Sequence, residues 1–211
     1  MDKYKELQKI KDEMEKDKNL PLVSRPEDVI PGDGNPDAEI VFIGEAGGYH
    51  ESVQRKPFVG QAGQLLNKLL TLAGIKREDV YITNMIKTRP PNNRDPLPEE
   101  LEAYSRYLDK ELEIINPEVI ITLGRYSMAK FLQNVFISSV HGKKYDVFWR
   151  GRDIVVIPMY HPAASLRNGN VMELEKTDFV NLKEILKKID EEKKTKEVKD
   201  DKVDVEQMSL V

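Results

Sequence analysis

Polar motifs follow apolar, β-branched runs at several separate places along this chain. The runs cover residues 38–43, 80–83, 119–123 and 154–159. Continuous Val and Ile runs of this kind are typical of strands that are buried on both faces of a parallel sheet. Helical patterns between the runs supply the crossovers that parallel strands require. The sequence therefore predicts the α/β class, with a short central parallel sheet.

The polar motifs after these runs are expected to meet in one place. The first run ends in Gly44-Glu45-Ala46-Gly47-Gly48, Asn84 follows the second, and His161-Pro162-Ala163 follows the fourth. Ligands of open parallel sheets bind in the crevice beyond the carboxyl ends of the strands. We therefore expect a Gly-rich loop, an amide side chain and an imidazole to line one pocket.

Length and composition favour one domain with tails. A chain of 211 residues with 39% hydrophobic content can fill one core. We place the domain at residues 1–190, with an N-terminal helix and an irregular lead-in over 1–36, and a disordered charged tail at 191–211. Because no apolar leader and no run of about 18 apolar residues occurs, we expect a cytoplasmic protein that does not insert into membranes. A monomer is expected.

Charge and cysteine content exclude several function classes. The net charge of -4 argues against coating nucleic acid by bulk electrostatics. It leaves room for a local basic patch, unless these cations are merely solvated loop residues; they are Lys56, Lys87, Arg89, Arg94, Lys143, Lys144 and Arg167. The chain has no Cys, which excludes disulfides, thiolate nucleophiles and Cys-ligated zinc or iron–sulfur clusters. Three dispersed His give no metal motif.

Each candidate residue of the first loop has two interpretations. The glycine pair at 47–48 lacks Walker spacing and any GxGxxG pattern, so a nucleotide-phosphate cradle is not predicted. Phe58 is either a lid on the core or a stacking surface for a flat ligand. Glu45 and Glu51 are either ordinary loop carboxylates, or one of them orients a water near the pocket.

The two polar residues at the later strand ends are also ambiguous when each is taken alone. Asn84 presents one donor and one acceptor side by side, which suits an amide-like ring edge, but a strand-terminal Asn is also a common turn former. His161 is either a satisfied structural residue or an acid, base or hydrogen-bond donor. The pocket hypothesis depends on their being close in space.

Taken together, these motifs resemble one family of DNA repair enzymes. The segments are 44–48, 57–66, 83–94 and 161–167, in that order and with compatible intervals. They are similar to the thermostable uracil-DNA glycosylases of archaea and bacteria, usually called family 4, over about residues 31–186. The resemblance implies a three-layer α/β/α sandwich that hydrolyses the N-glycosidic bond of deoxyuridine in DNA, in base-excision repair.

The resemblance also implies roles for the residues that line the pocket. Phe58 would stack on the flipped uracil, Asn84 would hydrogen-bond its polar edge, and His161 would donate to uracil O2. Glu45, Ala46, Gly47 and Gly48 would line the pocket with the backbone. Glu51 matches an acidic position that helps to place the attacking water. A side chain in the segment 48–51 would exclude the C5 methyl of thymine, and cytosine presents the opposite donor pattern to the amide.

Contacts with the DNA follow from the same resemblance. Leu166 and Arg167 would act as the wedge and the phosphate clamp during base flipping. Asn93 matches a secondary polar position of the Pro-rich loop. The remaining DNA-binding candidates are the basic residues of that loop, namely Lys87, Arg89 and Arg94.

The chain departs from the family pattern at two places. Family members hold a four-iron, four-sulfur cluster with four Cys, whereas the corresponding positions here are Thr88, approximately Tyr104, and residues 16–19. We therefore expect no cofactor, and noncovalent contacts between the N-terminal segment and the Pro-rich loop. Gly47 replaces the usual Pro, which is expected to loosen the loop and to weaken catalysis or widen base specificity.

The sequence leaves two alternative functions open and suggests one further binding partner. The alternatives are a catalytically weak relative that binds damaged bases in DNA, and a glycosylase with broadened specificity for deaminated bases. A hydrolase of free nucleosides is disfavoured by the basic loops. Near the C-terminus, Gln207 and Leu210 match the start of peptides that dock on sliding clamps, although the usual aromatic pair is missing. The competing interpretation is a frayed end.

Overall fold

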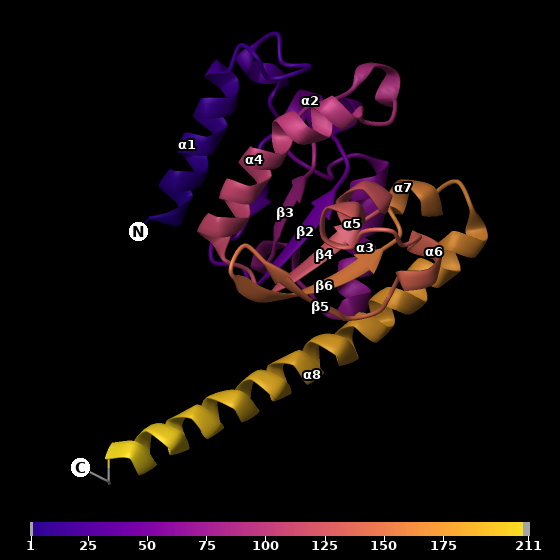
Figure 1. Ribbon diagram of the computed structural model, residues 1–211. Helices are drawn as coiled ribbons and strands as arrows, with labels where there is room; N and C mark the ends of the chain where they lie inside the picture. The colour runs from indigo at the N-terminus through magenta and orange to yellow at the C-terminus, as the bar shows by residue number, and fades with distance from the viewer. Residues whose placement is uncertain (1, 209–211) are drawn as a thin grey trace.

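A six-stranded sheet forms the centre of the computed structural model, which describes the backbone of residues 2–208 and the side chains of 2–195. Figure 1 shows the sheet between helices on its two faces. The strand order is β1-β3-β2-β4-β6-β5. The predicted α/β class with helices on both sides is therefore confirmed.

The four inner strands pair in parallel and correspond to the four predicted runs. They are β2 (Ile40–Gly44), β3 (Tyr81–Asn84), β4 (Val119–Leu123) and β6 (Arg152–Met159). Two antiparallel strands close the edges, namely β1 (Asp33–Gly34) beside β3 and β5 (Tyr145–Trp149) beside β6. Because the inner strands are parallel, their carboxyl ends lie at one edge of the sheet. We call this the catalytic edge.

Two hydrophobic clusters hold the helices against the sheet. Along β2 the side chains alternate in direction, so Val41 and Ile43 belong to one cluster while Phe42 belongs to the other. Helices α1 (Lys3–Lys16) and α4 (Pro98–Ile115) supply the first cluster, and α3 (Gln61–Ala73) and α8 (Gly169–Met208) supply the second. The three-layer arrangement follows from this alternation.

The helix boundaries agree with the sequence patterns. Leu7, Ile10 and Met14 are the buried residues of α1, as their helical spacing predicts. Helix α3 ends at Gly74, which adopts the left-handed conformation of a C-cap. Helix α4 begins at Pro98, in the first-turn position that tolerates proline.

The remaining helical segments are short. They are α2 (Tyr49–Gln54), α5 (Arg125–Phe131), α6 (Ile137–Val140), α7 (Pro162–Ser165) and the single 3₁₀ turns at Pro26–Asp28, Arg77–Asp79 and Pro91–Asn93. Helices α2, α5 and α7 follow β2, β4 and β6 within a few residues. The residues that enter these helices therefore lie at the catalytic edge.

The C-terminal segment differs from the expectation of a disordered tail. Helix α8 is continuous to Met208, and Figure 1 shows its last part extending away from the sheet. In the part of this helix whose side chains are described, Lys187 and Glu191 pair at the i,i+4 spacing. The boundary at residue 190 therefore marks where packing on the sheet ends, since Ile189 is the last buried apolar residue among those described.

Within residues 2–208, the structure contains no helix that is both long enough and apolar enough to cross a lipid bilayer.

Candidate active site

The catalytic edge brings together the ends of β2 and β3. Gly44 and Asn84 are opposite each other in the parallel register. A Cβ atom on Gly44 would lie 2.4 Å from Asn84 Oδ1 and 2.6 Å from the ring of Phe58. Any side chain at position 44 would therefore collide with both groups. Glycine is required here so that an amide and an aromatic ring can meet over the strand end.

Asn84 carries an unsatisfied hydrogen-bond acceptor. Its side chain is 2% exposed, and Oδ1 is buried without a hydrogen-bond partner among the described residues. A buried acceptor without a partner costs on the order of 1–3 kcal/mol of folding free energy. An N–H or O–H of a ligand bound at this strand end would satisfy this acceptor.

Phe58 is held in an unfavourable backbone conformation. Its φ of 54° lies in the left-handed region, and the residue is 5% exposed. For a bulky residue this conformation costs roughly 1–3 kcal/mol and is found mainly at functional sites. The strained loop thus fixes the ring beside Asn84 rather than leaving it as a simple lid on the core.

His161 lies at the N-cap of α7 and is held as one neutral tautomer. The backbone N–H of Ala163 donates to His161 Nδ1 at 3.1 Å, so the ring proton must be on Nε2. Burial lowers the pKa of His161 to about 4, and the neighbouring positive charge of Arg167 acts in the same direction, against an opposing effect of Glu51. At neutral pH, His161 is therefore an uncharged N–H donor.

The aromatic rings of Phe58 and His161 lie against each other. Their centroids are 5.5 Å apart with an interplanar angle of 29°, which is an offset-stacked arrangement. The structure thus brings Asn84, Phe58 and His161 into one site, as the sequence predicts. Gly124, which follows β4, lies close to His161, since an added Cβ would be 3.2 Å from His161 Cβ and 3.6 Å from its ring.

Glu51 braces the loop instead of presenting a free carboxylate. Its Oε1 accepts hydrogen bonds from the backbone of Val59 at 2.9 Å and Gly60 at 2.7 Å, and Oε2 accepts one from Gly48 at 3.1 Å. The residue is 8% exposed. These three bonds tie both ends of the loop around Phe58 together. The geometry therefore assigns Glu51 a positioning role, in place of the water-placing role that the sequence suggests.

Glu45 is the carboxylate that remains available. It is half-buried, and its side chain has no hydrogen bond to the described residues. Burial raises the pKa of Glu45 above its usual value, the negative charge of Asp95 acts in the same direction, and Arg125 and Arg167 oppose the shift. Of the two loop carboxylates, Glu45 is the one whose oxygens are free to bind a water.

Ala46, Gly47 and Gly48 connect the end of β2 to α2. Ala46 packs on the first hydrophobic cluster, and Gly48 is the N-cap of α2. The backbone N–H of Gly47 donates to the carbonyl of Thr88 at 3.3 Å, a bond that a proline cannot form. A Cβ on Gly47 would also lie 2.3 Å from Ile30 Cδ1. This loop is thus tied to the Pro-rich loop through the residue expected to loosen it.

Lys87 is wrongly predicted as a DNA-binding residue. Its side chain is fully buried, and its ammonium group contacts Thr83 Oγ1 and pairs with Glu111 Oε2. A lysine inside the domain cannot reach a phosphate on the surface. Lys87 follows a strand end, and the sequence there does not distinguish a lysine in a buried ion pair from one exposed on the surface.

The other basic residues of the Pro-rich loop lie nearer the surface. Arg89 Nε donates to Asn93 Oδ1 at 2.8 Å. The Arg94 guanidinium binds Glu100 through two nitrogens, at 2.9 Å and 2.5 Å. Arg94 therefore fastens the loop to α4, and its charge is already neutralised. Arg89 and Asn93 remain candidates for contact with DNA.

Leu166 and Arg167 project from the end of α7. Leu166 is 48% exposed, and Arg167 is exposed without an ion-pair partner among the described side chains. Below them, Ser165 is buried and its Oγ donates to Glu175 Oε2 of α8. The sequence analysis missed this contact, which joins the His161-containing turn to the longest helix.

The positions of the family's cluster ligands do not suit an iron–sulfur cluster. The chain has no Cys, and Tyr104 is fully buried with its hydroxyl donating to the carbonyl of Pro21 at 2.7 Å. The hydroxyl of Tyr107 donates to Asp17 Oδ2 at 2.8 Å. Two tyrosines of α4 thus hold the segment after α1 by hydrogen bonds, where the family uses metal ligands. No set of three His, Asp or Glu side chains within the described residues is arranged to bind a metal.

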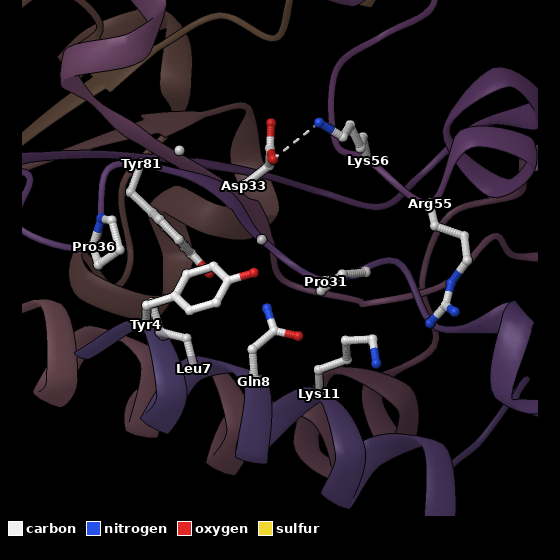
Figure 2. Close-up of a pocket in the computed structure, with 12 residues that line it drawn as sticks. Tyr4, Leu7, Gln8, Lys11, Pro31, Asp33, Pro36, Arg55, Lys56 and Tyr81 are labelled. Carbon is white, nitrogen blue, oxygen red and sulfur yellow. Dashed lines mark ion pairs between the residues drawn. The ribbon is translucent and has the colours of Figure 1, made fainter. Parts of the chain in front are cut away.

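A separate cavity lies between α1 and the lead-in (Figure 2). It contains none of the site residues Asn84, Phe58 and His161. Its cations are already paired, since Lys11 and Arg55 contact Glu15, and Lys56 contacts Asp33. The cavity is therefore distinct from the candidate active site.

The fold and the site are those of a protein that binds a flat, polar ligand at the edge of a parallel sheet. A parallel sheet whose carboxyl edge presents a buried amide, a neutral imidazole and a strained aromatic residue is arranged to bind a flat, polar ring. Comparison with known proteins agrees: residues 31–187 match the Uracil DNA glycosylase superfamily. The chain belongs to this superfamily.

Characterised relatives cover most of the chain. A Type-4 uracil-DNA glycosylase of Archaeoglobus fulgidus is 49% identical over 74% of this chain and 81% of its own length. The enzymes of the same name from Sulfurisphaera tokodaii and Thermotoga maritima are 43% and 44% identical, over 85% and 80% of this chain and 84% and 88% of their own lengths. The predicted resemblance is confirmed.

Proposed function

We propose that this protein is a uracil-DNA glycosylase that hydrolyses the N-glycosidic bond of deoxyuridine in DNA during base-excision repair. The observation that carries the proposal is the unsatisfied Oδ1 of Asn84, buried beside Phe58 and the neutral His161. Uracil offers an N3–H donor to this oxygen and a flat face to the aromatic ring. Cytosine has an acceptor at N3, so the same oxygen repels it.

The chemistry needs fixed donors rather than a proton transfer. When the bond between N1 and the sugar C1′ breaks, its electron pair remains on uracil, and the sugar becomes oxocarbenium-like. The N–H of His161 Nε2 donates to O2, where the negative charge develops. Because the imidazole is held by Ala163 before the substrate binds, little reorganisation is needed in the transition state.

Water attack completes the reaction at C1′. Glu45 is the loop carboxylate with free oxygens, so we assign to it the hydrogen bond that orients the attacking water. Glu51 holds the loop by three backbone hydrogen bonds. We assign to the segment 48–51 the exclusion of the C5 methyl of thymine. Flipping a nucleotide out of duplex DNA costs a few kcal/mol. Leu166 and Arg167 lie at the exposed end of α7, where they would stabilise the flipped state.

No cofactor enters this proposal. We propose that the chain acts as a cluster-free monomer in the cytoplasm, with the tyrosine contacts of α4 replacing the family's iron–sulfur cluster as the brace of the N-terminal segment. The purified protein is then expected to be colourless, with no stoichiometric iron. Visible absorption together with bound iron would contradict this part of the proposal.

A uracil-release assay tests the proposed reaction. Single-stranded and duplex DNA containing one uracil serve as substrates, matched DNA with cytosine or thymine serves for specificity, and free deoxyuridine is the control. Uracil should be released from DNA only. His161→Ala should lower the single-turnover rate by about 10²-fold or more while DNA binding is retained. Binding of uracil-containing DNA without release would instead indicate a damaged-base-binding relative.

A further inference from the structure

Tyr49 is an exposed aromatic residue at the margin of the candidate active site. It is the first residue of α2, directly after the glycine pair, and its side chain is 59% exposed. The guanidinium carbon of Arg89 lies 5.4 Å from the centre of its ring. From the sequence, the segment 48–51 as a whole is expected to exclude the C5 methyl of thymine, and no role follows for Tyr49 in particular.

Arg89 is held from two sides, and its outer nitrogens are unused. The ring of Tyr49 covers one face of the guanidinium, and Nε donates to Asn93 Oδ1 at 2.8 Å. Neither Nη atom has a hydrogen-bond partner within the described part of the chain. A stacked guanidinium has lost rotamer freedom already, so binding an anion through the Nη atoms costs less entropy.

The charge of Arg89 sets it apart from comparable arginines. Three other arginines stack on aromatic rings and also pair with carboxylates: Arg106 on Tyr107 with Asp17, Arg125 on Tyr126 with Asp95, and Arg150 on Trp149 with Glu113. A fourth, Arg152, stacks on Trp149 without a carboxylate partner among the described residues, but one of its Nη atoms donates to the carbonyl of Pro117 and the other is buried. Arg89 has no carboxylate partner among the described residues. Its positive charge is therefore available to an external anion.

The stacked pair is coupled to the uracil-binding loop through the backbone. Gly47 donates its N–H to Thr88, so the residues that precede Tyr49 and Arg89 are joined directly. An anion bound by Arg89 would therefore lie beside the loop that contains Phe58 and Glu51. In the proposed substrate, the anions that flank a flipped base are the phosphates of the DNA backbone.

We propose that Tyr49 is a positioning residue for DNA binding, which holds Arg89 so that its Nη atoms bind a phosphate of the uracil-containing strand. This inference rests on the proposed function, because it requires DNA as the substrate. The ring of Tyr49 acts through Arg89, and its hydroxyl is not needed. Together the two residues form a second phosphate clamp, beside the loop that contains Gly47 and Gly48.

Steady-state kinetics at several salt concentrations tests the clamp. Arg89→Ala is expected to raise KM for uracil-containing DNA about 5–10-fold, with kcat within about twofold, and to reduce the salt dependence by about one phosphate contact. Tyr49→Ala should shift KM and the salt dependence in the same direction by a smaller factor, and should add nothing to Arg89→Ala. Tyr49→Phe, which keeps the ring, should match the wild type.

Arg150→Ala is the matched control. It also removes one stacked arginine, but from the hairpin turn at the opposite end of β6 from His161, so KM and its salt dependence should not change. Equal salt dependence in Tyr49→Ala and the wild type would overturn the inference, as would a loss in Tyr49→Phe equal to that in Tyr49→Ala. A lower kcat with unchanged salt dependence would indicate a structural role and would overturn it too.

The two proposals fail separately. If the wild type releases uracil and Tyr49→Ala behaves identically, only the clamp is wrong. If the wild type releases no uracil from any DNA, the proposed function is wrong. Titration of fluorescent DNA with the same variants then still decides whether Tyr49 and Arg89 act together on phosphate.

Discussion

Two sets of buried polar groups in this domain have opposite hydrogen-bonding states. We call the first set, Glu51, Lys87, Thr83 and Glu111, the frame. Glu51 accepts three backbone hydrogen bonds, and Lys87 contacts both Thr83 and Glu111. In the site itself, Asn84 Oδ1 is buried without a partner among the described residues, and Glu45 is half-buried without a hydrogen bond from them. Asn84 is as deeply buried as Lys87 and Glu111, but only the latter two have hydrogen-bond partners among the described residues. The frame stabilises the fold, whereas the site gives up stability to remain ready for a ligand.

The largest effect is expected where the frame is broken. Lys87→Ala leaves the Glu111 carboxylate buried without its cation, which should lower the free energy of unfolding by about 3–5 kcal/mol. Urea denaturation at neutral pH measures the change. The salt dependence of DNA binding should stay as in the wild type, because Lys87 does not reach the surface.

A paired substitution controls for the loss of volume at this position. Lys87→Met combined with Glu111→Leu removes both charges and should restore most of the stability. If Lys87→Ala unfolds no more easily than the wild type while its affinity for DNA falls, the assignment of Lys87 to the frame is wrong.

The second effect is expected in the site and has the opposite character. Asn84→Ala removes an acceptor that has no partner among the described residues, so the relief of its desolvation cost offsets the packing that is lost, and the free energy of unfolding should change by less than about 1 kcal/mol. The single-turnover rate of uracil release should fall by about 10²-fold or more, because recognition of N3–H is lost. Thermal unfolding and rapid-quench kinetics on the same preparation measure both quantities.

Glu51→Gln provides the comparison for this variant. It weakens the brace around Phe58, so activity and stability should fall together. A strong loss of stability in Asn84→Ala, with activity lost only in proportion to the unfolded fraction, would remove the distinction between frame and site.

Strand positions and the meeting of distant motifs could be predicted from the sequence, because both depend on short apolar runs. Each inner strand is buried on both faces, so its Val and Ile residues identify it without reference to the rest of the chain. Parallel pairing then places Asn84 and His161 at the same edge. The three-layer arrangement and the roles of the site residues came from the family resemblance.

Side-chain pairing could not be predicted, because it depends on distances across the fold. Nothing local to Lys87 shows that Glu111 lies beneath it, and nothing local to Glu51 shows that Gly60 returns to it. Burial of Glu175 did leave a signal, since it stands four residues before the buried Phe179 on one face of α8. That periodicity predicts a carboxylate facing the core.

A third prediction uses this carboxylate to test the contact between α7 and α8. Burial raises the pKa of Glu175 to about 7, the charge of Asp178 acts in the same direction, and the Ser165 hydroxyl opposes the shift. Because the folded protein binds this proton more tightly than the unfolded chain, the contribution of Glu175 to stability is fully present below about pH 4.5 and is lost as the pH rises through about 7. The loss should be on the order of 1–3 kcal/mol.

Glu175→Gln removes this titration while keeping an acceptor for Ser165. The variant should gain stability relative to the wild type between pH 5 and pH 8, measured by urea denaturation at each pH. Asp178, which pairs with His141 nearby, also has its pKa raised by burial, so Asp178→Asn is the control for its contribution. Parallel stability curves for Glu175→Gln and the wild type would show that Glu175 remains ionised in the folded state.

The smallest effect is expected in the C-terminal segment, which contributes to neither the frame nor the site. Gln207 and Leu210 lie outside the part of the chain whose side chains the structure describes. If they dock on a sliding clamp, the helix before them acts as a tether that raises the local concentration of the enzyme at replicating DNA. Deleting residues 207–211 should then leave uracil release from short oligonucleotides unchanged and should weaken binding to the clamp of the same organism.

The missing aromatic pair predicts a weak interaction, so titration by fluorescence is preferable to capture on beads. Equal clamp binding by the full chain and the truncated chain would show that the match is accidental, while a slower rate on short oligonucleotides would show that α8 supports the catalytic edge.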